Sequence, residues 1–232
     1  MGLTKTDYVR GMQCPKMLWL DRHKPEAREI PAEVRCRMDR GNDFGDRMMG
    51  VFGPYVEVQE YYPGTKHPDK EKMAAKTAEL IAAGTKIICE AAFMDAAGNY
   101  CAVDILRWDE ETECYDIYEV KNSLRVSDQF IMDAAFQAHL VRKTGLPIGR
   151  VFILFHGEEP YDLEEITQTV EMYSPWIEKN LEWLSRIKDQ PEEFSCEMGV
   201  HCACPYQCWY YGYCQALQRT ISRDAPPTEN TR

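Results

Sequence analysis

The chain has 232 residues and a formal net charge of −11, and it is 44% hydrophobic and 28% charged. This length fits one domain with elaborations, and the composition is that of an ordinary globular protein. No apolar run reaches the length of a membrane span, and the N-terminal residues lack the apolar core of a signal peptide. We therefore expect a cytoplasmic protein without a membrane partner. The acidic balance argues against a non-specific coat on nucleic acid.

The first third of the chain is predicted to be mostly helical. Thr4 and Asp7 form a capping-box-like start to a short helix, which reaches about Leu20 and is interrupted at Cys14 and Pro15. The elements predicted next are a helix over 33–51, a strand over 55–62, and an amphipathic helix over 69–83 that Gly84 ends.

The middle of the chain predicts a β-meander, with strands over 86–94, 100–108 and 113–123. The elements predicted after it are a helix over 128–143, a strand over 150–156, a helix that Ser174 and Pro175 open and that reaches about Lys188, and a flexible tail over 219–232. This order of elements predicts an α/β fold with a mixed sheet flanked by helices.

Charged residues interrupt the apolar strands of the meander. Asp104 lies in YCAVDILRW, and Glu119 and Lys121 flank Val120 in YDIYEVKNS. A charge inside such a run is costly to bury unless something binds it. Side chains two residues apart on a strand point the same way, so Glu119 and Lys121 share a face, which Asp104 joins if the strands pair. Glu90 ends another apolar run and offers a further carboxylate.

Two converging carboxylates with one ammonium form a site for a hard divalent cation, Mg²⁺ or Mn²⁺. An acid-bearing strand, a D/ExK strand and a following helix with glutamine resemble the PD-(D/E)XK nuclease superfamily, specifically its RecB-like branch. The matching residues are Asp104, Glu119 with Lys121, and Gln137, and Glu90 stands where the branch often has an acid one strand earlier. The resemblance implies a restriction-endonuclease-like fold, metal ligation by Glu90, Asp104 and Glu119, and catalytic roles for Asp104, Glu119, Lys121 and Gln137.

The sequence departs from this family pattern at two positions. Members of the branch commonly have a histidine ligand four residues after a glycine on an early helix, and here the residue four after Gly41 is Gly45. The tyrosine expected four residues after Gln137 is replaced by Val141. The number of metal ions, one or two, therefore stays open.

Cysteines are concentrated near the C-terminus of the chain. Five of the ten lie within one short segment, at positions 196, 202, 204, 208 and 214. This clustering indicates thiolate ligation of a metal. No CxxC pair is present in the segment, as zinc knuckles favour, and the spacing of Cys202, Cys208 and Cys214 suits an iron–sulfur cluster better, with Cys14 as the remote fourth ligand.

A group of RecB-like exonucleases, including the CRISPR-associated one, is similar in this respect. These proteins bracket the nuclease core with one N-terminal and three C-terminal cysteines that hold a 4Fe-4S cluster. An uncharacterised bacterial RecB-like family resembles both ends of this chain. The resemblance implies cluster ligation by Cys14, Cys202, Cys208 and Cys214, with Cys204 as the alternative to Cys202. It also implies one domain over 1–218, in which 1–30 and 196–218 form the iron–sulfur element.

Taken together, the motifs predict a divalent-metal-dependent DNA nuclease, an exonuclease or an enzyme that prefers single strands. Its partners would be DNA and, by analogy, proteins of DNA repair or CRISPR adaptation. The alternative is a nucleic-acid-binding or redox-sensing iron–sulfur module with a degenerate nuclease site, which the missing histidine favours.

Overall fold

The protein, described here from a computed structural model over residues 2–157 and 160–224, has an α/β fold built on one mixed sheet. The strands lie in chain order, as β1 (Val56–Glu57), β2 (Ile87–Met94), β3 (Tyr100–Asp109), β4 (Cys114–Lys121), β5 (Ile148–Phe155) and β6 (Asp162–Glu165). The pairs β2–β3, β3–β4 and β5–β6 are antiparallel, whereas β1–β2 and β4–β5 are parallel. The mixed sheet and the predicted β-meander are both confirmed.

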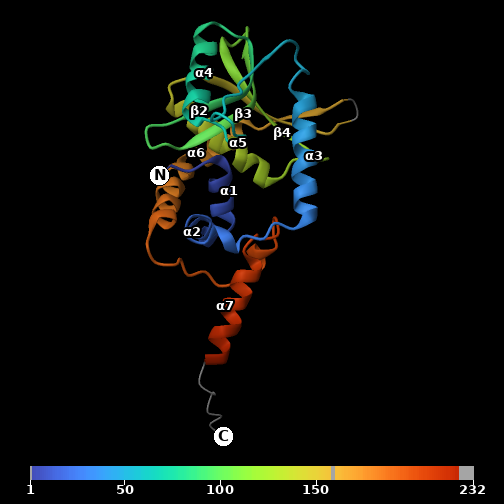
Figure 1. Ribbon diagram of the computed structural model, residues 1–232. Coiled ribbons are helices and arrows are strands. Elements are labelled where there is room, and N and C mark those ends of the chain that lie inside the picture. The colour runs from blue at the N-terminus through green and yellow to red at the C-terminus, as the bar shows by residue number, and fades with distance from the viewer. Residues whose placement is uncertain (1, 158–159, 225–232) are drawn as a thin grey trace.

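Helices surround this sheet, as predicted (Figure 1). They are α1 (Lys5–Gln13), α2 (Pro15–His23), α3 (Ala32–Met48), α4 (Lys70–Ala82), α5 (Asp128–Lys143), α6 (Thr167–Asp189) and α7 (Tyr211–Asp224), with short 3₁₀ turns at Pro25–Ala27 and Val200–Cys202. The capping box of Thr4 and Asp7 starts α1, and the chain breaks at Cys14 before Pro15 starts α2. None of the helices in the described ranges is long and apolar enough to span a bilayer.

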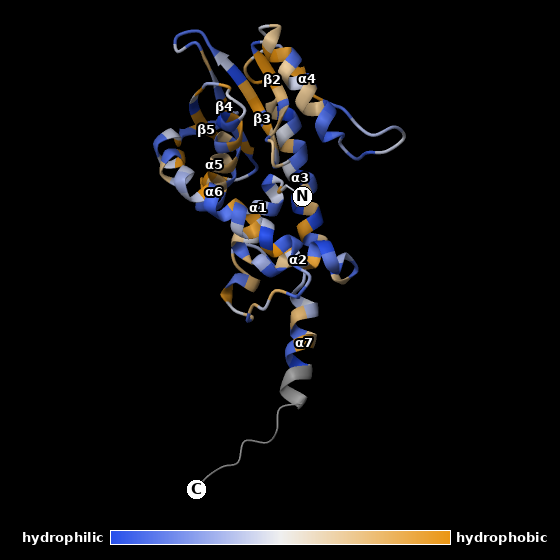
Figure 2. Ribbon diagram, turned by 90° about the vertical axis from the view of Figure 1, so that its left-hand side faces the viewer, coloured by the Kyte–Doolittle hydropathy of each residue, from blue (hydrophilic) through white to orange (hydrophobic). Residues whose placement is uncertain are grey.

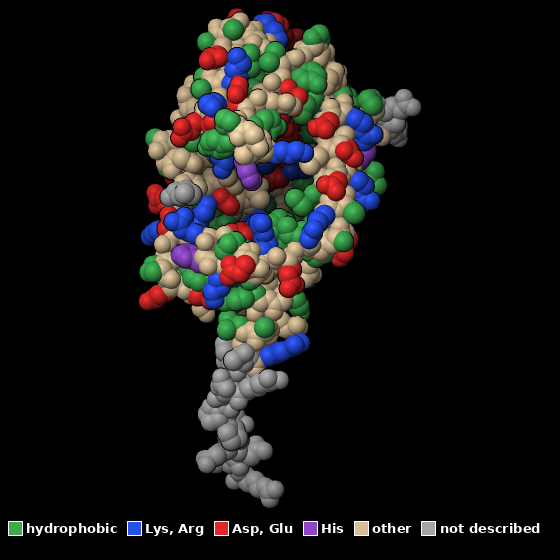
Figure 3. Space-filling view, in the orientation of Figure 1, with side chains coloured by type: hydrophobic (Ala, Val, Ile, Leu, Met, Phe, Trp, Pro, Cys, Tyr) green, Lys and Arg blue, Asp and Glu red, His purple; other side chains and the backbone are tan. Residues whose placement is uncertain are grey.

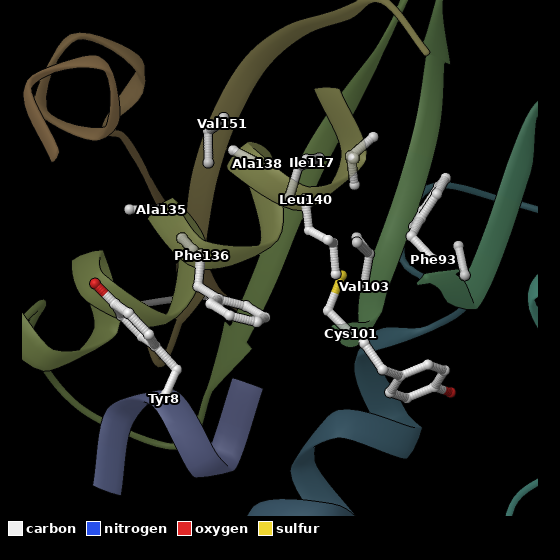
Figure 4. Close-up of a cluster of buried hydrophobic side chains, with 14 of the residues drawn as sticks. Tyr8, Phe93, Cys101, Val103, Ile117, Ala135, Phe136, Ala138, Leu140 and Val151 are labelled. Carbon is white, nitrogen blue, oxygen red and sulfur yellow. The ribbon is translucent and has the colours of Figure 1, made fainter. Parts of the chain in front are cut away.

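The two faces of the sheet are covered by different helices. The larger core packs α1, α4, α5 and α6 on one face, and Figure 4 shows Tyr8 and Phe136 side by side there, next to Val103 and Ile117 of the sheet. The opposite face is covered by α3, which contributes Phe44 and other apolar residues to a smaller cluster. Figure 2 shows the corresponding hydrophobic colouring of β2 and β3.

The alternation of side chains along β2 and β3 reverses at Glu90 and Asp104. Cys89 belongs to the cluster under α3, whereas Ala91 belongs to the larger core on the other face. Residues two apart on a regular strand share a face, so the strand must be distorted between them. Glu90 carries the distortion, with a left-handed φ of 53° that is uncommon for residues other than glycine.

A third cluster lies below the sheet and joins the two ends of the chain. Cys14, Met17 and Trp19 from the N-terminal helices pack there with Ile187 of α6 and with Cys202, Cys208 and Tyr210 of the C-terminal segment. From this segment α7 extends away from the body of the molecule (Figure 1). Helix α7 continues through Asp224, so residues 219–224 of the predicted tail are helical, and residues 225–232 lie outside the described part.

The predicted start of the last long helix at Ser174 and Pro175 is wrong. Helix α6 begins at Thr167 and contains Pro175 in its interior. Its first turn is held to the sheet, because Val151 donates its backbone N–H to Thr167 Oγ1 at 3.0 Å and Val170 is buried in the core. These contacts outweigh the cost of a proline inside a helix.

The edge strands also differ from the sequence prediction. The strand predicted over 55–62 is shorter: Val56 and Glu57 pair with β2, and Val58 donates one more backbone hydrogen bond to Cys89. The chain then leaves the sheet and turns back at Tyr62–Thr65, with an isolated bridge between Tyr61 and Pro68. Strand β6 was not predicted. All four of its residues are exposed, so it has no apolar alternation by which to recognise it.

Candidate functional site

A cavity of about 1100 Å³ opens between the sheet, α1, α3 and the C-terminal segment. Figure 3 shows the hollow in the centre of the molecule, with acidic and basic side chains inside it. Glu90, Asp104, Glu119 and Lys121 all line this cavity. The sequence-predicted metal ligands and the predicted catalytic lysine therefore face one space.

The register of the sheet explains why the three acids line one cavity. The pairs Cys89–Ile105 and Ala91–Val103 set Glu90 opposite Asp104, and the pair Ile105–Tyr118 sets Asp104 opposite Glu119. These acids thus occupy adjacent positions on three neighbouring strands. The distortion at Glu90 falls at the same level of the sheet. Non-glycine residues in such backbone conformations cluster at functional sites.

Glu119 lies at the centre of a network of hydrogen bonds and ion pairs, and it is fully buried. Its Oε1 atom is 2.6 Å from Lys121 Nζ and 2.9 Å from Lys5 Nζ. Its Oε2 atom accepts a hydrogen bond from Gln137 Nε2, and Gln137 is also fully buried. Lys121 in turn pairs with Asp133 of α5. The predicted residues Glu119, Lys121 and Gln137 are therefore in direct contact.

Sequence reasoning missed Lys5 and Asp133 as members of this network. Asp133 precedes Gln137 by four residues on α5, so helical spacing puts the two on one face, and that spacing could have identified it. Nothing in the sequence around Lys5 indicates its role. Only the packing of α1 against the rest of the fold brings Lys5 to Glu119.

The carboxyl groups of Asp104 and Glu119 have opposite pKa shifts. Burial, together with the negative charge of Glu119, raises the pKa of Asp104 to about 7. Burial would also raise the pKa of Glu119, but the ammonium groups of Lys121 and Lys5 outweigh it and lower that pKa to about 2. Burial also raises the pKa of Glu90. At neutral pH, Glu119 carries its charge and Asp104 is near half-protonated.

These three acids offer the kind of donor that a hard divalent cation prefers, although their carboxylate oxygens do not all lie within 4.8 Å of one another. Mg²⁺ and Mn²⁺ prefer carboxylate and carbonyl oxygens, and Glu90, Asp104 and Glu119 offer them in one cavity. One oxygen of Asp104 accepts the backbone N–H of Val120 at 2.6 Å, which fixes the orientation of the carboxyl group. Gln137 Oε1 is buried and has no hydrogen-bond partner among the described residues, so it is a free acceptor beside the site.

The helix that lacks the family's histidine lies along the same cavity. Gly45 of α3 lines it, and a Cβ atom added there would meet nothing within 4 Å. The position therefore has room for a larger side chain at the cavity wall.

A second group of possible metal ligands lies in the cluster that joins the chain ends. The Sγ atoms of Cys14 and Cys196 are 3.9 Å apart, and Cys196 Sγ is 3.6 Å from His201 Nε2. One ligand atom from each of the three lies within 4.8 Å of the others, so they form a possible Cys₂His metal-binding group. Cys14 was predicted as a ligand, whereas Cys196 and His201 were missed. Their separation by five positions in a cysteine-rich segment is the pattern that could have revealed them.

The other predicted cluster ligands lie around this group. Cys202 and Cys208 are buried in the same apolar cluster as Cys14, and Cys214 is half-buried. Burial raises the pKa of the Cys208 thiol, and the nearby thiols of Cys202 and Cys214 raise it further. Cys204, the alternative to Cys202, is exposed.

The C-terminal segment also forms one wall of the acidic cavity. Gln13 Nε2 donates to the carbonyl oxygens of His201 and Tyr206, each at 2.7 Å. The Arg10 guanidinium lies 4.1 Å from the ring centroid of Trp209, and both residues line the cavity. The cysteine segment is thereby attached to α1, the helix that brings Lys5 to Glu119.

Compared with known proteins, the chain matches no protein-family model and has no significant match among the curated proteins.

Proposed function

We propose that this protein is a divalent-metal-dependent DNA nuclease of the PD-(D/E)XK type, similar to the RecB-like branch. The observation that carries the proposal is the convergence of Glu90, Asp104 and Glu119 from three adjacent strands in one cavity with Lys121. A buried charged network of this kind is costly for the fold, and perturbed carboxyl groups in a cleft are typical of catalytic sites.

The proposed roles follow from the contacts of each side chain. A divalent cation supplies polarisation of the phosphate and a water that ionises near neutral pH. Glu119 and Asp104 would hold it, with Glu90 as a further ligand. Lys121, kept protonated beside Glu119 and Asp133, would orient the attacking water and offset charge that develops on the phosphate. Gln137 would fix the rotamer of Glu119.

We further propose a 4Fe-4S cluster at Cys14, Cys202, Cys208 and Cys214, and a substrate with single-stranded ends. The cysteine proposal is supported by the burial of Cys14, Cys202 and Cys208 in one apolar cluster that joins both chain ends. A cluster at this place would clamp α2 to the C-terminal segment, so its role would be structural. The substrate proposal is supported by the aromatic rings of Tyr206 and Trp209 at the cavity wall, on which unpaired bases can stack.

The test is digestion of end-labelled single-stranded and duplex oligonucleotides with Mg²⁺ or Mn²⁺. We expect cleavage by the wild type and a loss of at least about a hundredfold in rate for Lys121→Ala, because an electrostatic contact to the transition state is removed. The matched control is Lys76→Ala, because Lys76 is exposed on α4 and pairs with Glu79. This variant should cleave as the wild type does.

Absence of cleavage by the wild type with every divalent cation tried would reject the nuclease proposal. Retained binding of the same oligonucleotides would then favour the alternative of a binding module with a degenerate site. Equal rates for the wild type and Lys121→Ala would reject the assigned catalytic site.

A further inference from the structure

Two of the three separations within the Cys14, Cys196 and His201 group match a single tetrahedral metal ion, and the third is no more than 4.8 Å. Zinc–sulfur bonds are about 2.3 Å and zinc–nitrogen bonds about 2.0–2.1 Å, so at a tetrahedral angle two sulfurs lie about 3.8 Å apart and a sulfur and a nitrogen about 3.6 Å apart. The observed separations are 3.9 Å for Cys14 Sγ to Cys196 Sγ and 3.6 Å for Cys196 Sγ to His201 Nε2.

Two of the three ligands, Cys14 and His201, are placed by hydrogen bonds of the surrounding backbone. Cys14 lies at the break between α1 and α2, where its N–H donates to Arg10 and its carbonyl accepts from Met17. His201 lies in a 3₁₀ turn, and its carbonyl accepts a hydrogen bond from Gln13. The positions of these two ligands therefore depend on the fold and not on any bound ion, as expected of a preorganised site.

We propose that Cys14, Cys196 and His201 bind a single soft divalent cation of the Zn²⁺ class, as a ligand set distinct from that of the iron–sulfur cluster. Thiolate and imidazole donors favour Zn²⁺ over the hard cations that suit the acidic cavity. Three protein ligands are sufficient for a tetrahedral site that keeps one position for water. Half-buried Cys196 and His201 give this position access to solvent.

The two occupants of the cysteine region exclude each other, because both use Cys14. The single-ion site needs Cys196 and His201, whereas the proposed cluster needs Cys202, Cys208 and Cys214. The two ligand sets can therefore be separated by substitution. The inference does not depend on the nuclease proposal, since none of its ligands lies among the acids of the cavity.

In the experiment, the full-length, metal-free, reduced protein is titrated with Co²⁺ alone, and binding is monitored by the absorption spectrum of cobalt. We expect one Co²⁺ per chain, with thiolate-to-cobalt charge transfer and the visible bands of tetrahedral cobalt. Cys196→Ala and His201→Ala should each weaken Co²⁺ binding by at least about tenfold, because loss even of groups that only support a ligand costs about 10–100-fold. The matched control is Cys204→Ala, in the same segment and exposed, which should bind as the wild type does.

A crossed comparison distinguishes this site from the cluster. Cys202→Ala should keep the cobalt spectrum, and it should fail to form a brown cluster when reconstituted with iron and sulfide. Cys196→Ala should do the reverse. Circular dichroism of the metal-free variants monitors their folding, and a folded Cys196→Ala with undiminished Co²⁺ affinity would overturn the proposal. A wild-type protein that binds no Co²⁺ would also overturn the proposal, whether or not it forms a brown cluster with iron and sulfide.

Discussion

Two carboxyl groups in the cavity have opposite pKa shifts because their surroundings differ. Glu119 accepts from Lys5, Lys121 and Gln137, so its negative charge is fully compensated. Asp104 receives one backbone N–H, from Val120, and lies opposite Glu119, whose charge opposes its ionisation. The contacts of Asp104 therefore do not stabilise its negative charge as those of Glu119 do. A bound cation would stabilise it.

This imbalance predicts that Asp104→Asn stabilises the protein in the absence of divalent cations. The pKa of Asp104 is about 7 in the folded protein, against its ordinary value of 3.8. A folded pKa above the unfolded one means that the contribution of this group to stability falls as pH rises from 3.8 to 7. Asparagine fixes the uncharged form. We expect a higher melting temperature for Asp104→Asn than for wild type at pH 8 and no difference near pH 4.

The measurement is thermal unfolding at both pH values in the presence of chelator. A melting temperature below that of the wild type at pH 8 would contradict the assigned environment of Asp104. The same variant should lose cleavage activity, so that stability and function change in opposite directions.

The same carboxyl group makes cation binding dependent on pH. Below pH 7 a cation must displace the Asp104 proton, and burial also raises the pKa of Glu90, so Mn²⁺ affinity should rise by at least about tenfold per pH unit up to about pH 7. Glu119, whose pKa is about 2, stays ionised throughout this range and adds nothing to the slope. Calorimetric titrations at pH 5.5, 6.5 and 8 measure this, and a flat profile would contradict it.

At the scale of the elements, Glu193 ties α2 to α7. Its carboxylate forms an ion pair with Lys16 and accepts hydrogen bonds from Lys24 and Tyr213, and these contacts lower its pKa to about 2 although burial opposes this shift. The Lys16 side chain is only 6% exposed, so loss of its partner would leave a buried charge without compensation. The pair therefore holds the N-terminal helices to the segment that carries the cysteines.

Glu193→Gln should lower the free energy of unfolding by about 1–2 kcal/mol at pH 7, after a reduction for partial solvent exposure. Because the folded pKa is depressed, this contribution is present above pH 4.5 and is lost as pH falls toward 2. Denaturant unfolding of the metal-free protein at pH 7 and pH 3 measures both effects. Glu192→Gln, at an exposed neighbouring position, should change stability by less than about 0.5 kcal/mol.

Helix α3 has an open position for a further cation ligand at Gly45. The cavity has room for a side chain there, and an L-residue at this helical position also gains helix propensity over glycine. Gly45→His should therefore fold stably and tighten Mn²⁺ binding by about tenfold, which corresponds to about 1.4 kcal/mol. Gly45→Phe, which has a helix propensity similar to that of histidine and no ligand atom, should leave the affinity unchanged. Equal affinities of the two variants would show that Gly45 does not face the cation.

At the scale of the whole molecule, the sequence predicted those parts that depend on local periodicity. Apolar, β-branched runs identified β2 to β5, and a capping box and a glycine identified α1 and α4. The face shared by Glu119 and Lys121 follows directly from the period of a strand. By contrast, the start of α6 is decided by contacts of Thr167 and Val170 with the sheet, which local patterns do not contain.

The composition of the two candidate sites depends on long-range packing. Lys5 reaches Glu119 across 114 positions of the chain, and Cys14 reaches Cys196 across 182. The left-handed backbone at Glu90 is equally invisible in the sequence, because glutamate has no preference for it. Motif spacing therefore identified the strand acids and missed the residues that α1 and the chain ends bring to them.

The most direct test of the cation site compares Mn²⁺ binding to wild type and to Asp104→Asn at pH 8. Binding is measured by the electron paramagnetic resonance signal of free Mn²⁺. Mn²⁺ prefers oxygen donors, so the signal reports the acidic cavity and not the thiols. We expect saturable binding by the wild type and by Asp43→Asn, a variant of an exposed acid on α3, and binding at least about tenfold weaker by Asp104→Asn. Equal affinity of wild type and Asp104→Asn for Mn²⁺, or no saturable binding by wild type, would contradict the gathering of these three acids around a cation.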